Sequence, residues 1–190
     1  MLKKIVVIGP ESTGKSTLCE QLAQHYNMLW CPEYAREYLQ THGTKYNYDD
    51  LLTIAKGQVE LEAKFTRMAN NRWQMTDRSI ISHQSSNLLF IDTDMFVMKV
   101  WCEFVFGKCH QFILDQIAKR KYDLYLLCNI DLEWEYDEMR EYPDIETRQK
   151  LYNIYKELMI SQPIPWIEIS GNDEHRLDTA VQFVGKLLKA

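Results

Sequence analysis

The feature that most constrains this chain is a short glycine-containing stretch near its beginning. Residues 9–16 read Gly-Pro-Glu-Ser-Thr-Gly-Lys-Ser and fit the pattern G-x-x-x-x-G-K-[ST]. A continuous apolar run at residues 2–8 precedes the stretch, and Leu18, Leu22 and Tyr26 follow it at helical spacing. This order predicts a buried strand, a tight loop and a helix, the arrangement that cradles a phosphate group.

Each residue type in this loop has a physical reason to be there. Gly9 and Gly14 let the backbone turn and approach an anion closely. We expect the Lys15 ammonium to bind the β- and γ-phosphates of a nucleotide and the Ser16 hydroxyl to ligate Mg²⁺. The alternative is an ordinary glycine turn capped by serine and threonine. The residues expected to contact the nucleotide are Gly9, Glu11, Ser12, Thr13, Gly14, Lys15, Ser16 and Thr17.

Further short apolar runs alternate with helical patterns along the rest of the chain. No repeat or Gly/Ser linker marks a domain boundary. Alternating strands and helices are typical of a parallel sheet covered on both faces. We therefore expect one α/β domain over residues 1–190, a P-loop NTPase or kinase-like fold with a five-stranded parallel sheet, helices on both faces and a helical lid. The expected strands are 2–8, 28–31, 88–91, 122–128 and 166–169, and the expected helices lie near 15–26, 33–41, 49–70, 97–105, 109–120, 146–161 and 177–188.

Carboxylates follow two of the expected strands. Asp92 and Asp94 come after the apolar run at 88–91, and Glu33 follows the run at 28–31. Ligands of open α/β sheets lie beyond the carboxyl ends of the strands. We expect Asp92 to hold Mg²⁺ with Ser16, and Asp94 to orient metal or substrate unless it only caps the next helix.

Glu33 is our first choice for the group that accepts a proton from an attacking hydroxyl. Arg36 follows one helical turn later and is expected to bind a phosphate or the acceptor. The alternative is a surface helix with an ion pair between these two residues. The residues expected to contact the acceptor are Glu33, Tyr34, Arg36, Asp94 and Trp134.

A strongly acidic segment lies between the fourth and fifth expected strands. Residues 131–148 hold eight acidic residues and two arginines, so this segment carries a charge of −6 and the rest of the chain +1. We expect it to form a lid whose Arg140 and Arg148 reach the transferred phosphoryl group, with an ion-paired helical face as the alternative. Trp134 is either a stacking ring or a core residue. Asn172 follows the fifth strand and is expected to line the adenine or to cap the last helix.

Composition narrows the class of partner. The net charge is −5, from 22 basic and 27 acidic residues, which argues against a protein that grips nucleic acid. The five cysteines do not follow a zinc spacing, and no apolar run is long enough to cross a membrane. We therefore expect neither a nucleic-acid nor a membrane partner, and a cytoplasmic location. The sequence does not indicate an oligomeric state.

Three motifs together resemble a known family. The loop at 9–17, Glu-Tyr-Ala-Arg-Glu-Tyr at 33–38 and Phe-Ile-Asp-Thr-Asp at 90–94 are similar to the NadR-type ribosylnicotinamide kinase domain. The resemblance continues through Trp101, the run at 122–128 and residues 134–140. It implies an ATP- and Mg²⁺-dependent kinase that phosphorylates the 5′-hydroxyl of nicotinamide riboside and gives nicotinamide mononucleotide, a step of NAD biosynthesis.

The chain also departs from this family. In the family the kinase domain often follows an adenylyltransferase domain and a DNA-binding region, whereas here the loop begins at residue 9, so we expect a stand-alone form without those activities. A polar insertion at about 72–85 has no assigned role. Two other readings stay open, a kinase for another nucleoside and a nucleotide-dependent switch that recruits a partner. No N-K-x-D motif is present, which disfavours a regulatory GTPase.

Overall fold

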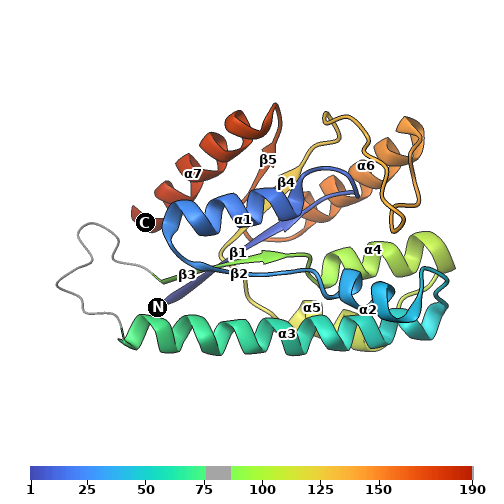
Figure 1. Ribbon diagram of the computed structural model, residues 1–190, viewed down its shortest axis with the longest axis horizontal. Helices are drawn as coiled ribbons and strands as arrows, with labels where there is room; N and C mark the ends of the chain where they lie inside the picture. The colour runs from blue at the N-terminus through green and yellow to red at the C-terminus, as the bar shows by residue number, and fades with distance from the viewer. Residues whose placement is uncertain (76–86, 190) are drawn as a thin grey trace.

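A computed structural model describes residues 1–75 and 87–189. Its five strands form one parallel sheet in the order β2-β3-β1-β4-β5, as the alternating pattern predicted. The central strand is β1, whose end feeds directly into the loop at residues 9–14 (Figure 1). The elements are β1 (Leu2–Ile8), α1 (Lys15–Tyr26), β2 (Leu29–Cys31), α2 (Tyr34–His42), α3 (Tyr48–Met75), β3 (Asn87–Asp92), α4 (Met95–Phe106), α5 (Gln111–Lys119), β4 (Leu124–Cys128), α6 (Ile145–Ser161), β5 (Trp166–Ile169) and α7 (Asp173–Lys189).

Helices cover both faces of the sheet, and successive side chains of β1 point toward opposite faces. Ile5 and Val7 pack with α1 and α7, whereas Val6 and Ile8 pack with α3, α4 and α6. Figure 1 shows α1 and α7 above the sheet and the long helix α3 below it. A third apolar cluster joins α2, α3, α4 and α5 beside the sheet. These layers fix the carboxyl ends of the strands, where the expected site residues lie.

The acidic segment differs from the expected helical lid. In residues 131–144 the chain forms turns and irregular backbone, and α6 begins only at Ile145. The Asp137 carboxylate accepts a hydrogen bond from the Met139 N–H, and the Asp144 carboxylate accepts one from the Thr147 N–H. Such local side-chain bonds compete with helical hydrogen bonds, and so the acidic residues favour turns and caps here. We call residues 131–144 the lid loop.

Two other expectations concern the polar insertion at about 72–85 and the absence of a membrane-spanning helix. Residues 72–75 of the expected insertion form the last turn of α3, and residues 76–85 of it lie outside the described residues. Within residues 1–75 and 87–189, no helix is both long and apolar enough to cross a membrane.

Candidate active site

The glycine-containing loop, residues 9–14, has the backbone shape of an anion cradle. Gly9, Ser12 and Gly14 all have positive φ values, 142°, 55° and 73°. Such turns aim successive N–H groups into one concavity. Lys15 opens α1 and its Nζ donates to the Pro10 carbonyl oxygen at 2.8 Å, so the ammonium is folded over the loop. The structure thus confirms the strand, loop and helix expected from the sequence.

Gly9 is required for two separable reasons. A methyl group at this position would lie 2.7 Å from the Cys128 carbonyl oxygen of β4, and the φ value of 142° also disfavours any side chain. We expect Gly9→Ala to lower the free energy of unfolding by about 3 kcal/mol, because both backbones are held by the sheet. Chemical denaturation measures the change. Gly107→Ala is the matched control, since Gly107 has φ 65° but nothing within 4 Å, and it should cost only about 1 kcal/mol. Equal losses in both variants would contradict the steric argument.

Ser16 and Asp92 meet at the end of β3, as expected. The Ser16 hydroxyl donates to Oδ2 of Asp92 at 2.5 Å, and Oδ1 of the same buried carboxylate has no hydrogen-bond partner. Burial, followed by the nearby charge of Glu33, raises the pKa of Asp92 to about 6. A hydroxyl beside a carboxylate with an unused buried oxygen fits the oxygen ligands that Mg²⁺ prefers. Ser16 and Asp92 are therefore the residues that would hold the metal.

Glu33 reaches the same region from the end of β2. Its Oε1 accepts a hydrogen bond from the Thr93 hydroxyl at 3.3 Å, and its side chain lines the cavity described below. Thr93 has φ 73°, a conformation that is rare for a β-branched residue. Backbone strain of this kind persists where surrounding contacts over-determine it. The hydrogen bond from Thr93 holds Glu33 near Asp92, whose pKa the Glu33 charge helps to raise.

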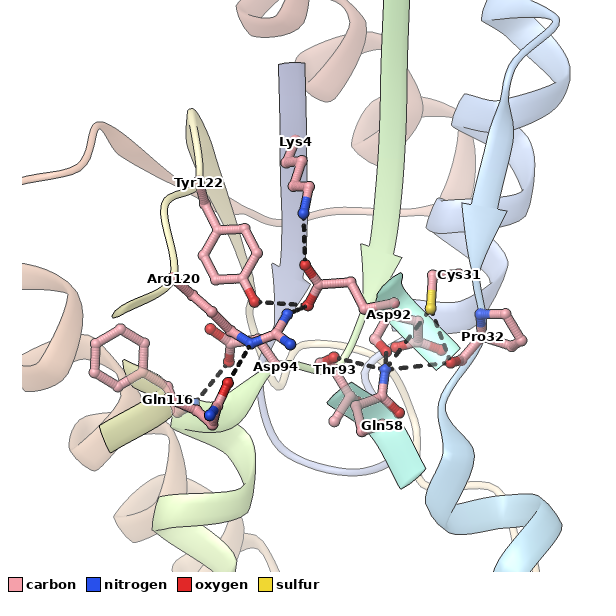
Figure 2. A network of polar contacts seen from close by, with 12 residues as sticks. Lys4, Cys31, Pro32, Gln58, Asp92, Thr93, Asp94, Gln116, Arg120 and Tyr122 are labelled. Carbon is pink, nitrogen blue, oxygen red and sulfur yellow. Dashed lines mark hydrogen bonds and ion pairs between the residues drawn. The ribbon is translucent and has the colours of Figure 1, made fainter. Parts of the chain in front are cut away.

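Gln58 of α3 ties these strand ends together. Its Oε1 accepts from the Tyr34 N–H at 2.7 Å, and its Nε2 donates to the carbonyl oxygens of Thr93 at 3.2 Å and Pro32 at 3.4 Å. Pro32 and Tyr34 flank Glu33, so one buried amide holds the chain on both sides of that carboxylate. Figure 2 shows the bonds from Gln58 to Pro32 and Thr93. One turn later on α3, the Glu62 carboxylate accepts hydrogen bonds from the charged or hydroxyl groups of Lys4, Arg120 and Tyr122.

We expect Gln58→Leu to reduce kcat for phosphoryl transfer by about tenfold with little change in the KM for ATP. Leucine fills a similar volume but leaves the Tyr34 N–H unpaired and frees the chain on both sides of Glu33. Steady-state kinetics gives the two parameters separately. The control is Gln162→Leu, because Gln162 makes comparable bonds at the end of α6, far along the chain from these motifs. A Gln58→Leu variant with full kcat would show that Gln58 serves stability alone.

Asp94 lies elsewhere than expected for a residue that touches substrate. Its Oδ1 accepts from the Phe96 and Val97 N–H groups at the start of α4, and its Oδ2 accepts from the Tyr125 hydroxyl. Burial raises its pKa to about 6, and it does not line the cavity. The structure thus places Asp94 in the capping role that was the alternative.

The other residues of the expected acceptor site divide into two groups. Arg36 lines the cavity, and its Nη2 forms an ion pair with Asp137 of the lid loop at 2.8 Å. Tyr34 does not line the cavity, because its ring packs against α3, where a Cβ at Gly57 would lie 2.1 Å from it. Trp134 also stays outside the cavity, half-buried against the guanidinium groups of Arg140 and Arg148 at 5.9 and 5.8 Å.

The two lid arginines occupy different positions. Arg140 lines the cavity and its Nη1 donates to the Ser12 hydroxyl at 3.2 Å. Arg148 belongs to α6 and lies buried behind the phosphate loop, where its Nη2 donates to the Ser12 carbonyl oxygen. Glu11 fixes the lid loop from the other side, since its Oε1 accepts from the N–H groups of Glu141 and Tyr142. Burial is the main cause of the raised pKa of Glu11.

Asn172 caps α7, because its Oδ1 accepts from the His175 N–H at 3.0 Å. This is the capping alternative, and Asn172 does not line the cavity. Contact with an adenine stays a prediction.

A cavity of about 430 Å³ connects these parts. The phosphate loop and Glu33 line it, together with five aromatic side chains and two glutamates of the lid loop. The Trp101 indole N–H donates to the Tyr46 hydroxyl at 2.7 Å, and Tyr46 donates to Glu141 at 2.8 Å. The aromatic members are Tyr46, Trp101, Phe104, Tyr142 and Tyr155, and the two glutamates of the lid loop are Glu138 and Glu141.

Several of these residues carried no functional signal in the sequence. Trp101 and Phe104 follow a helical apolar spacing that predicts core packing, and Tyr46 lies in a stretch expected to be a loop. Gln58 acts through contacts such as its bond to Thr93, 35 positions away, which no local pattern reveals. An alignment of relatives would be the signal that could single them out.

Comparison with known proteins places the chain in a family. Residues 4–176 match the model of the AAA_28 family, described as an AAA domain. The chain belongs to the AAA_28 family. The curated relatives include the trifunctional NAD biosynthesis/regulator protein NadR of Escherichia coli, 23% identical over 189 residues, and of Salmonella typhimurium, 24% identical over 192 residues. The match covers 98% of this chain but only 43% of each relative, so the AAA_28 chain spans less than half of their length.

Solved structures show the same fold. A NadR protein in complex with NR superposes with a TM-score of 0.69 at 21% identity, over 99% of this chain and 51% of that one. A NadR protein in complex with NAD and AMP-PNP gives a TM-score of 0.66, and a thymidylate kinase from Ehrlichia chaffeensis gives 0.65 at 14% identity over 98% of both chains. The architecture of this AAA_28 protein is therefore that of a P-loop kinase-like α/β fold.

Proposed function

We propose that the protein is an ATP-dependent kinase that phosphorylates the 5′-hydroxyl of nicotinamide riboside and gives nicotinamide mononucleotide, a step of NAD biosynthesis. One observation carries this proposal. The phosphate loop and Glu33 line a single cavity of about 430 Å³, so the proposed phosphate site and the proposed proton acceptor share one space. The likeness to NadR proteins, one of them in complex with NR, supports the choice of acceptor.

The proposed reaction uses the side chains in the places described. ATP binds along residues 9–17, and the Lys15 ammonium leaves the Pro10 carbonyl oxygen for the β- and γ-phosphates. Glu33 accepts the proton of the 5′-hydroxyl while the oxygen of that hydroxyl bonds to the γ-phosphorus. The bond between the γ-phosphorus and the oxygen that bridges to the β-phosphate breaks at the same time. ADP leaves with the displaced electron pair. A Mg²⁺ ion held by Ser16 and Asp92 would supply charge neutralisation at the phosphates, and Arg140 adds a positive charge from the lid loop.

The aromatic and acidic lining of the cavity suits a flat cationic ring. Aromatic faces attract a cation, and the carboxylates of Glu138 and Glu141 add complementary charge. The nicotinamide ring of the riboside is planar and positively charged, whereas the bases of ordinary nucleosides are neutral. Tyr46 and Trp101 are therefore the rings that we assign to the base.

A panel of nucleosides tests the acceptor. Purified protein is incubated with ATP and Mg²⁺ and, in separate reactions, nicotinamide riboside, adenosine, cytidine, uridine or thymidine. We expect nicotinamide riboside to have the highest kcat/KM by about tenfold or more. If a neutral nucleoside is the preferred substrate, the proposed acceptor is wrong and the proposed kinase activity stands. Tight nucleotide binding without any phosphorylated nucleoside would favour the switch instead. The cytoplasmic location stays a prediction.

A further inference from the structure

Two buried arginines grip consecutive carbonyl oxygens of the phosphate loop from behind. The side chain of Arg148 in α6 donates through Nη2 to the Ser12 carbonyl oxygen at 3.2 Å and to the Leu132 carbonyl oxygen at 3.3 Å. Arg176 in α7 donates through Nη1 to the Thr13 carbonyl oxygen at 3.0 Å. The two arginines are only 3% and 2% exposed, so neither is a surface residue that meets the loop by chance.

The remaining contacts of Arg176 show that it connects several loops at the carboxyl ends of the strands. Its Nε donates to the Gly171 carbonyl oxygen at 2.7 Å, and its Nη2 donates to the Asn129 carbonyl oxygen at 3.1 Å and to the Asp131 carboxylate. One guanidinium group thereby joins the segments that follow β1, β4 and β5. The planar fork of arginine can satisfy several carbonyl oxygens at fixed angles, which a lysine ammonium cannot do.

Holding a carbonyl oxygen also sets the direction of an N–H group. A trans peptide is planar, so the C=O of one residue and the N–H of the next point in opposite directions, and the described chain contains no cis peptide bond. With the Ser12 and Thr13 carbonyl oxygens turned back toward the arginines, the N–H groups of Thr13 and Gly14 point the other way. Thr13, Gly14 and Lys15 line the cavity and neither arginine does, so the side of the loop away from the arginines is the side of the cavity.

The loop needs this support because its conformation is costly. Ser12 has φ 55°, a left-handed value that is unfavourable for a residue with a side chain. Arg148 binds the Ser12 carbonyl oxygen, and the Ser12 hydroxyl accepts two further hydrogen bonds, from the Glu135 N–H and from Arg140. A donor array that is already aimed avoids reorganisation when the anion binds.

We propose that Arg148 and Arg176 are positioning residues that lock the peptides after Ser12 and Thr13 so that their N–H groups face the bound phosphates. Neither arginine touches the nucleotide in this account. The inference requires only that the loop binds polyphosphate, so it is independent of the acceptor in the proposed function.

The test measures polyphosphate binding in folded variants of the full chain. Dissociation constants for AMP-PNP and for inorganic tripolyphosphate are obtained by calorimetry for Arg148→Gln, Arg148→Lys and Arg176→Lys. We expect both constants to rise by about tenfold in each variant, lysine included, because a lysine keeps the charge but loses the fork. Arg120→Gln is the matched control: it removes a partly buried arginine, paired with Glu62, and should lower the melting temperature without changing either constant.

Three results would overturn the proposal. Wild-type constants in a folded Arg148→Gln variant would leave Arg148 a purely structural residue. Wild-type constants in both lysine variants would mean that charge alone matters and that peptide geometry does not. An equal loss of affinity in Arg120→Gln would trace the effect to general destabilisation. If the Arg176 variants do not fold, the Arg148 variants alone test the proposal. The panel of nucleosides tests the proposed function separately.

Discussion

Replacing Lys15 with alanine is expected to lower kcat/KM for phosphoryl transfer by about a thousandfold or more. Its ammonium is the positive charge of the loop that can stabilise negative charge on the γ-phosphate during transfer, and Lys15 lines the same cavity as Glu33. Within residues 1–75 and 87–189 its Nζ donates to the Pro10 carbonyl oxygen, and it belongs to no apolar cluster, so its loss should not disturb the packing of β1 and α1. Coupled ADP detection with nicotinamide riboside measures the effect.

The comparison for Lys15→Ala is Lys121→Ala, which removes an exposed lysine in the turn before β4. Both variants should unfold at nearly the wild-type temperature, and only Lys15→Ala should lose turnover. Retained turnover in a folded Lys15→Ala protein would contradict the assignment of the loop as the phosphate site.

The second large effect is expected for Glu33→Gln, which should reduce kcat by about a hundredfold to a thousandfold with a smaller change in the KM for ATP. The amide is nearly the same size and can still accept from the Thr93 hydroxyl, but it cannot take the proton of the attacking hydroxyl. Pre-steady-state measurement of nicotinamide mononucleotide formation isolates the chemical step from product release.

Glu37→Gln is the control for this substitution, because Glu37 is an exposed residue of α2, four positions after Glu33, which precedes that helix as its N-cap. It should retain full activity. If Glu33→Gln is as active as the wild type, another group receives the proton and the proposed role of Glu33 is wrong.

The fold followed from the sequence because its signals are local. Each buried strand is a short apolar run, and the helices α1 and α4 carry apolar residues at helical spacing, so their order alone predicts a parallel sheet. The lid loop was expected to be helical and is irregular, again because of local interactions. Its carboxylates bond to neighbouring N–H groups, an outcome that charge density alone does not reveal.

The site was harder to predict because residue type does not fix direction. Asp92 and Asp94 are two positions apart, yet one contacts Ser16 and the other caps α4. Arg140 and Arg148 belong to one acidic stretch, yet the first lines the cavity and the second lies behind the loop. These distinctions depend on contacts across the sheet, which appear only when the chain is folded.

The central claim is that phosphate passes from ATP to a nucleoside hydroxyl in this cavity. The most direct test measures, in one reaction, the ATP consumed and the nicotinamide mononucleotide formed by the purified protein. The account predicts one phosphorylated nucleoside for each ATP consumed, and ATP consumption that rises when nicotinamide riboside is added. ATP hydrolysis that is unaffected by the riboside, with no phosphorylated product, would contradict it.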